Sequence, residues 1–305
     1  MQKHSSNKGS HLVDQILKGD LRAASRLLTL AERREPEARP HLKCLYPHTG
    51  QARLIGITGP AGTGKSTLVN HLITGFRHKK KKMGVLAVDP TSPLSGGAIL
   101  GDRLRMQPHF LDRDVFIRSL STQGRLGGLS PGLFDAIHIL DAMGKDIILI
   151  ETIGVGQDEI HIARLAETVL LVLTSGMGDI VQTMKSGLLE IGDVIAVNKA
   201  DILDGAAFIQ ELEEMRPERP AIPVSAEKGT GIKTLVSQLE RLMPKKRAVR
   251  DKRERFAREE LKWLLYERFT ASQSGIPFQD RLIRQIARRE KNPYDALEKY
   301  DPSET

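Results

Sequence analysis

The chain has 305 residues, 40% of them hydrophobic and 28% charged, as in a folded globular protein. No apolar run reaches the roughly 20 residues that a membrane span needs, which excludes an integral membrane protein. The polar start Met1–Ser10 lacks the apolar core of a secretory signal. Cys44 is the only cysteine, which excludes a disulfide framework and a cysteine-based metal cluster. The net charge of +8 is unusual. Such an excess of basic residues can favour binding to nucleic acid, an acidic membrane surface, a phosphate-bearing ligand or an acidic partner. We expect a cytoplasmic protein.

The first part of the chain is predicted to be helical. Apolar residues recur at helical spacing over 11–34, and we expect a break at Gly19-Asp20 to separate two segments. Three prolines then indicate a connecting stretch: Pro36, Pro40 and Pro47. We therefore expect residues 1–50 to form a helical extension.

The central part, 51–244, has the pattern of an α/β domain. Seven short apolar runs lack the alternation of half-exposed strands: Leu54–Ile57, Val85–Val88, Val115–Ile117, Ile147–Ile150, Val169–Leu173, Val194–Val197 and Ile222–Val224. Such runs are typical of parallel strands buried on both faces. Helix-like stretches separate them, which predicts a mostly parallel, doubly wound sheet.

The last part, 245–305, is predicted to be a helical extension. One long charged helix is expected over 247–268 and a second over 278–290. Eight basic residues and two acids lie between Lys245 and Arg258, a net +6, and Lys79–Lys82 form a smaller basic cluster. Only 4% of residues are aromatic, and Phe256 is the one aromatic residue within these runs, so a nucleic-acid surface is poorly supported.

The strongest functional signal is a glycine-rich loop that follows the run Leu54–Ile57 and precedes a helix. It reads Gly59-Pro60-Ala61-Gly62-Thr63-Gly64-Lys65-Ser66, followed by Thr67. Between a strand and a helix, this pattern is typical of a phosphate-binding loop, in which glycines let backbone N–H groups converge on the phosphates. We expect Lys65 to reach the β- and γ-phosphates, Ser66 to ligate Mg²⁺, and Thr67 to contact the α-phosphate.

Two later loops predict which base is bound. Asn198-Lys199-Ala200-Asp201 and Ser225-Ala226-Glu227-Lys228-Gly229 each follow an apolar run. An Asp201 carboxylate can accept hydrogen bonds from guanine N1–H and the 2-amino group, donors that adenine lacks, and such sites discriminate by up to about 10⁴–10⁵. We expect Asn198 to brace the loop, the Lys199 stem to lie over the base, and the Ala226 N–H to meet the guanine oxygen.

Two acidic residues stand where strands are predicted to end. Asp89 follows Val85–Val88, and Glu151 follows Ile147–Ile150. Because ligands bind at the carboxyl ends of parallel strands, either carboxylate can hold Mg²⁺ through its waters or orient the attacking water. The alternative is that each caps the helix that follows. The segment Glu151–Gly154 has the spacing of a switch, with the Gly154 N–H as the expected γ-phosphate sensor.

Five segments in this order resemble those of MeaB/ArgK-type GTPases, chaperones associated with methylmalonyl-CoA mutase. They are Gly-Pro-Ala-Gly-Thr-Gly-Lys-Ser-Thr (59–67), Ala-Val-Asp-Pro-Thr-Ser-Pro (87–93), Gly-Gly-Ala-Ile-Leu-Gly-Asp-Arg-Leu-Arg-Met (96–106), Glu-Thr-Ile-Gly-Val-Gly-Gln (151–157) and Asn-Lys-Ala-Asp (198–201). The resemblance covers nearly the whole chain, including both helical extensions.

The resemblance implies a Mg²⁺-dependent GTPase that cycles between GTP and GDP and forms homodimers through its C-terminal helices. It implies that an adenosylcobalamin-dependent acyl-CoA mutase is the partner, whose cofactor loading the GTPase gates. It assigns Asp102 to the metal and water shell with Asp89 and Glu151. It also implies switches at 91–106, 151–159 and 176–186, the last carrying Asp179, Gln182 and Lys185.

Two other functions remain as alternatives. A GTPase that delivers nickel to a hydrogenase or urease predicts Cys/His pairs, whereas this sequence has one cysteine and scattered histidines. A non-enzymatic basic module would use the run 245–258 to bind RNA or anionic lipid, and its binding would fall steeply with salt.

Overall fold

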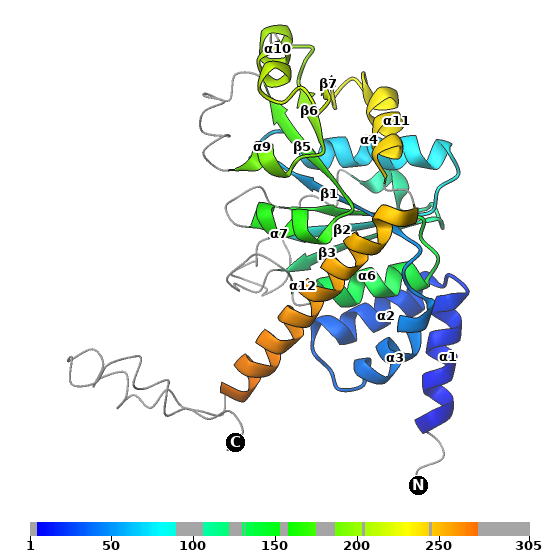
Figure 1. Cartoon of the computed structure of the whole chain (residues 1–305). Helices are drawn as coiled ribbons and strands as arrows, with labels where there is room; N and C mark the ends of the chain where they lie inside the picture. Colours follow the sequence, from blue (N-terminus) through cyan, green and yellow to red (C-terminus); the bar gives the residue numbers. More distant parts are fainter. Residues whose placement is uncertain are drawn as a thin grey trace, which may run out of the picture. The chain divides into compact units, whose positions relative to one another are not determined.

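The structure is a computed structural model that describes residues 5–89, 106–121, 130, 132–152, 158–174, 187–202, 205–243 and 246–273 (Figure 1). The predicted residues Asp102, Gly154, Asp179, Gln182 and Lys185 lie outside these ranges, as does the helix expected over 278–290. By internal contacts the chain divides into two units, Met1–Arg255 and Phe256–Thr305. The boundary falls within the long helix α12 (Lys246–Gln273).

All seven predicted strands form one parallel sheet, which confirms the doubly wound α/β fold. The strands are β1 (Arg53–Thr58), β2 (Met83–Asp89), β3 (Val115–Ser121), β4 (Ile147–Glu151), β5 (Thr168–Thr174), β6 (Val194–Asn198) and β7 (Ala221–Pro223). Their order is β3-β2-β4-β1-β5-β6-β7, so the strand before the glycine-rich loop is central. The carboxyl ends of all seven therefore meet at one edge of the sheet, where ligands bind in open α/β folds.

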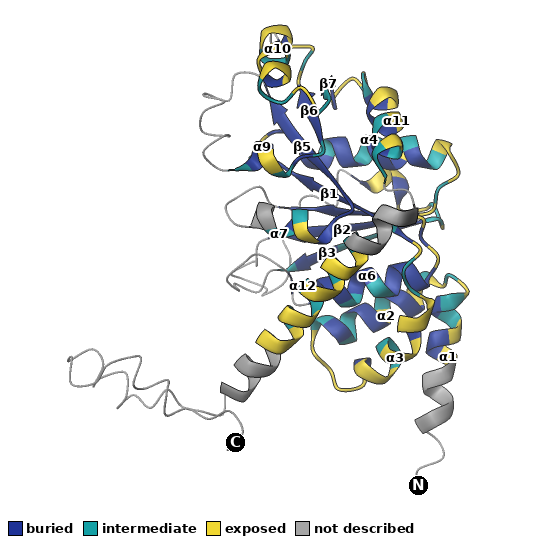
Figure 2. Ribbon diagram, viewed as in Figure 1, coloured by how far each residue is buried: buried dark blue, intermediate teal, exposed yellow. Residues whose placement is uncertain are grey.

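Helices cover both faces of the sheet, which explains why most of its strand residues are apolar (Figure 2). On one face, α4 (Lys65–His78) and α11 (Ile232–Leu242) share a core with alternate residues of the strands, including Ile55 and Ile57. The opposite face carries α6 (Leu133–Ala142), α7 (Asp158–Leu165), α9 (Leu188–Ile191) and α10 (Gly205–Met215). Each fully buried aliphatic side chain contributes about 1.5–3 kcal/mol.

The N-terminal extension consists of α1 (Ser5–Leu17), α2 (Leu21–Glu32) and α3 (Ala38–Leu45), followed by the short η1 (Tyr46–His48). The predicted break is confirmed: the Asp20 side chain caps α2 by accepting from the Ala23 N–H at 2.8 Å. The predicted connecting stretch is wrong, because residues 38–45 are helical. Pro40 lies in the first turn of α3, where its missing N–H breaks no helical hydrogen bond.

The basic run at the start of α12 makes contacts within the first unit. Lys252 donates to the Glu167 carbonyl oxygen, and Arg253 donates to that of Gly50. Arg255 lies 3.4 Å from the Ala166 carbonyl oxygen. Cations interact favourably with the carbonyl groups at the end of a helix, and the carbonyls of Ala166 and Glu167 directly follow α7. No described helix is long and apolar enough to span a membrane.

Candidate functional site

The glycine-rich loop connects β1 to α4 and depends on glycine where its backbone turns. Gly59 and Gly64 have φ values of 139° and 87°, which residues other than glycine rarely adopt. A Cβ on Gly59 would lie 2.1 Å from the Val172 carbonyl oxygen, and one on Gly64 would lie 2.4 Å from Asn198 Nδ2. The loop is therefore pressed against β5 on one side and against the end of β6 on the other.

Lys65 begins α4, and its amine is buried within the loop. Lys65 Nζ donates to the carbonyl oxygens of Gly59, at 2.7 Å, and Pro60, at 3.0 Å. Thr63 Oγ1 donates to the Pro60 oxygen at 2.9 Å, which tightens the turn. No side chain caps the first turn of α4, so its N–H groups and the lysine form a site suited to an anion.

Ser66 and Glu151 lie together at the carboxyl ends of the strands. Ser66 Oγ donates to Glu151 Oε1 at 2.7 Å, which joins the loop helix to the end of β4. Asp89 ends the neighbouring strand β2, two residues after Ala87, which pairs with Glu151. Both carboxylates are 5% exposed. One hydroxyl and two carboxylates supply the hard oxygen atoms that Mg²⁺ prefers.

This arrangement can supply only part of a metal's ligands. Within the described ranges, no three His, Cys, Asp or Glu residues cluster as a metal site. A magnesium ion usually keeps several waters and takes further ligands from phosphates, so a partial set of protein oxygens fits it.

Asn198 connects the glycine-rich loop to the loop Ser225–Gly229 that follows β7. Its Nδ2 donates to the Thr63 carbonyl oxygen at 2.8 Å, and its Oδ1 accepts from the Ala226 N–H at 2.9 Å. This is the bracing contact expected from the sequence. The Ala226 N–H that takes part in this contact is the one that we expect to meet the guanine oxygen.

Asp201 lies beside the loop that follows β7. Its carboxylate forms an ion pair with Lys228 at 3.0 Å. Hydrogen bonds from Ser225 and Lys228 lower the Asp201 pKa, which keeps the carboxylate ionised and able to accept at neutral pH. Sequence reasoning gave Lys228 no role, although it stands in the same loop as Ser225. Lys199, before Asp201, is exposed and has a φ of 60°.

Known proteins resemble this chain along most of its length. A sequence profile described as "Methylmalonyl Co-A mutase-associated GTPase MeaB" matches residues 24–274. A candidate GTPase of Pyrococcus abyssi is 41% identical over 305 aligned residues, which cover 94% of each chain. The "Methylmalonic aciduria type A homolog, mitochondrial" of Caenorhabditis elegans is 33% identical over 68% of this chain and 57% of its own length.

The solved structure of a LAO/AO transport system kinase shares the fold, with a TM-score of 0.69 over 96% of each chain at 21% identity. The matched profile and the Pyrococcus abyssi relative are both described as GTPases, which agrees with the glycine-rich loop between β1 and α4. By these similarities, the chain belongs to the MeaB family of methylmalonyl-CoA mutase-associated GTPases and hydrolyses GTP.

Proposed function

We propose that this GTPase uses Mg²⁺-dependent hydrolysis of GTP to drive a chaperone cycle on an adenosylcobalamin-dependent acyl-CoA mutase of the methylmalonyl-CoA mutase type. In this cycle it gates loading of the mutase cofactor and protects the mutase. The observation that carries the proposal is the family match over residues 24–274, because its description names the mutase. We further propose that the protein is cytoplasmic and homodimeric, with 51–244 as the GTPase domain between two helical extensions.

The phosphate loop is proposed to bind the nucleotide's phosphates through its backbone N–H groups. Lys65 would exchange its two carbonyl partners for phosphate oxygens, which neutralises negative charge on the transferred group. Residues 59–67 would contribute to this site, and the Thr67 side chain would contact the α-phosphate. The buried amine is already within the loop, so this exchange needs only a local movement.

Ser66, Asp89 and Glu151 would hold Mg²⁺, directly or through water, together with Asp102. When bound, this ion would stabilise charge on the β- and γ-phosphate oxygens. Glu151 already accepts from Ser66, so the two oxygens are close enough to serve one ion. The carboxylates of Asp89 and Glu151 would also orient the attacking water, with the Gly154 N–H as a sensor of the γ-phosphate.

The guanine base is proposed to lie between Asn198–Asp201 and Ser225–Glu227. Because Asp201 is ionised, it can accept from both guanine donors, and the amide of Asp201→Asn would replace one acceptor by a donor. We expect Asp201→Asn to lose GTP affinity and to prefer xanthosine triphosphate, as measured with fluorescent analogues of both nucleotides. Equal ATP and GTP binding by the wild type would contradict the guanine assignment.

The partner is tested by titrating purified methylmalonyl-CoA mutase of the same cell with the GTPase. We expect saturable binding that differs between the GDP and GTP states, and hydrolysis that is faster when the mutase is present. A mutase that neither binds the protein nor changes its GTP hydrolysis would overturn the proposed cycle while leaving the GTPase activity intact.

A further inference from the structure

Two adjacent apolar side chains stand in solvent before the edge strand β3. Phe110 is 52% exposed and Leu111 is 95% exposed. They follow the short helix η2 (Gln107–His109) and lie at the amino ends of the strands. The nucleotide site lies at the opposite end of the sheet, about 20 Å away for strands of this length. Single exposed apolar residues are common, so exposure alone indicates little.

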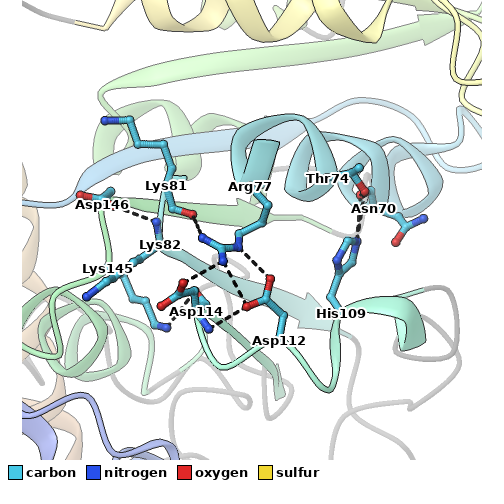
Figure 3. A network of polar contacts seen from close by, with 10 residues as sticks. All are labelled: Asn70, Thr74, Arg77, Lys81, Lys82, His109, Asp112, Asp114, Lys145 and Asp146. Atoms are coloured by element: carbon cyan, nitrogen blue, oxygen red, sulfur yellow. Dashed lines mark hydrogen bonds and ion pairs between the residues drawn. The ribbon is translucent and has the colours of Figure 1, made fainter. Parts of the chain in front are cut away.

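The turn that carries these side chains is held by a half-buried polar network (Figure 3). Arg77 at the end of α4 donates to Asp112 Oδ2 at 2.8 Å and to Asp114 Oδ2 at 2.7 Å. It also donates to the Lys81 carbonyl oxygen at 2.8 Å, and the Asp114 N–H donates to Asp112 Oδ1 at 2.9 Å. One arginine thus joins the turn before β3 to the turn before β2.

His109 holds the other side of the same turn. It is 9% exposed, and its Nε2 lies 3.1 Å from the Asn70 carbonyl oxygen of α4 (Figure 3). The Asp112 N–H donates to the His109 carbonyl oxygen at 3.1 Å. Phe110 and Leu111 therefore project from a segment with anchors before and after them. A preorganised segment loses little conformational entropy when a partner binds.

Positive charge surrounds the turn. The turn and the segments beside it carry seven basic residues: Arg77, Lys79, Lys80, Lys81, Lys82, Arg113 and Lys145. They carry four acidic residues, Asp112, Asp114, Asp146 and Glu240, which leaves a surplus of three positive charges. The four carboxylates are each engaged, with Arg77, Lys79 or the Lys82 N–H. Lys80, Lys82 and Arg113 are exposed, and the Lys80 backbone has a positive φ of 59°.

We propose that Phe110–Arg113 and Lys80–Lys82, together the edge turn, form a docking surface for an acidic segment of the partner mutase that carries an apolar side chain. The inference rests on the proposed function and specifies which surface performs it. Positive charge would steer the acidic segment, while Phe110 and Leu111 would be desolvated at the centre of the contact. A lipid surface is less suited, because its uniform negative charge would also meet the carboxylates of Asp112 and Asp114, which follow the apolar pair. A protein segment can place its acidic groups beside Lys80 and Lys82 alone.

The test compares two variants with a matched control. Lys80→Glu/Lys82→Glu reverses the charge, and Leu111→Ser removes the more exposed side chain of the apolar pair, which is 95% exposed and packs against little else. The control is Arg39→Glu/Lys43→Glu on α3, which changes the net charge equally at exposed positions of the N-terminal extension. Mutase affinity is measured by calorimetry at low and high salt, and GTP hydrolysis is measured without the mutase.

We expect each edge-turn variant to weaken mutase binding by about tenfold, with hydrolysis unchanged and the control close to wild type. The salt dependence of binding should be smaller in Lys80→Glu/Lys82→Glu than in the wild type. If the wild type binds the mutase and both variants bind it equally well, the docking surface is wrong and the proposed function stands. If the wild type does not bind the mutase, both fall. Retained mutase binding combined with lost binding to phosphatidylserine vesicles would assign the edge turn to a membrane and overturn the proposal.

Discussion

At the scale of single residues, the Asn198 side chain joins the glycine-rich loop to the loop that follows β7, the two halves of the proposed nucleotide site. We expect Asn198→Ala to leave the Thr63 carbonyl oxygen and the Ala226 N–H without their partner. Each unsatisfied buried group costs about 1–3 kcal/mol, so the free energy of unfolding should fall by about 2–4 kcal/mol. GTP affinity should fall on the order of tenfold, since misplacing the loops costs at least about 1.4 kcal/mol.

Urea unfolding and titration with a fluorescent GTP analogue measure these two effects. Asn70→Ala is the matched control, because the buried Asn70 Oδ1 has no hydrogen-bond partner in the described structure. Equal losses in both variants would show that Asn198 has no special bridging role.

Lys145 gives the stability a pH dependence. It is 4% exposed, donates to the Asp114 carbonyl oxygen at 3.0 Å, and burial lowers its pKa from 10.5 to about 8. Between these two values the unfolded chain binds more protons than the folded chain, so the free energy of unfolding rises with pH. In Lys145→Met this contribution is absent.

Relative to Lys145→Met, the wild type should gain about 2–3 kcal/mol of stability between about pH 7 and about pH 10, because the two pKa values differ by about two units over this range and one unit corresponds to about 1.4 kcal/mol. Urea unfolding of both proteins across this range measures the gain. A stability difference that does not change with pH would show that Lys145 titrates normally.

The sequence predicted residue types at the site better than their contacts. Asn198 and Asp201 were identifiable because they follow a buried strand in a recognisable order. The partner of the Ala226 N–H was not identifiable, because it depends on how closely two loops approach in space. His109 and Lys145 were also missed, since a single buried polar residue leaves no periodic pattern.

At the scale of elements, the phosphate loop gives a matched pair of glycine substitutions. Gly59 and Gly62 both have positive φ, at 139° and 79°, but only a Cβ on Gly59 would meet another atom, the Val172 oxygen at 2.1 Å. Gly62→Ala should cost only the backbone strain, about 1–2 kcal/mol. Gly59→Ala should cost at least about 3 kcal/mol, because β5 must also move.

Thermal unfolding without nucleotide measures both costs and separates them from effects on binding. A Gly59→Ala protein as stable as Gly62→Ala would mean that β1 and β5 separate easily at the loop.

Elements were predictable where a pattern repeats. Seven apolar runs gave seven strands, because strands buried on both faces must be apolar throughout. The sequence does not predict the helix α3, because three prolines favour a connecting stretch there, although Pro40 lies where a helix tolerates proline. The contacts of Lys252 and Arg253 with backbone oxygens were not visible in the sequence, because a basic run has the same composition whether it is solvated or caps a helix.

At the scale of the whole molecule, the boundary between the two compact units does not coincide with the point where the sequence pattern changes from strands to a charged helix. The change from strands to charged helix occurs near Pro244, whereas the first compact unit ends at Arg255. The reason is that Lys252, Arg253 and Arg255 contact the first unit although they belong to α12. Sequence patterns locate secondary structure, but unit boundaries follow contacts.

This boundary predicts a separable C-terminal arm. In the second unit, Leu261, Leu264 and Leu265 are 59%, 45% and 58% exposed, at spacings that place them on one face of α12. If a second copy of the chain covers this face, residues 1–255 should be monomeric yet hydrolyse GTP within about twofold of the full chain, because the nucleotide site lies entirely in the first unit. Light scattering after size-exclusion chromatography measures the mass. Leu261→Ser/Leu265→Ser in the full chain should weaken the dimer without truncation, whereas a dimeric 1–255 would place the interface in the first unit.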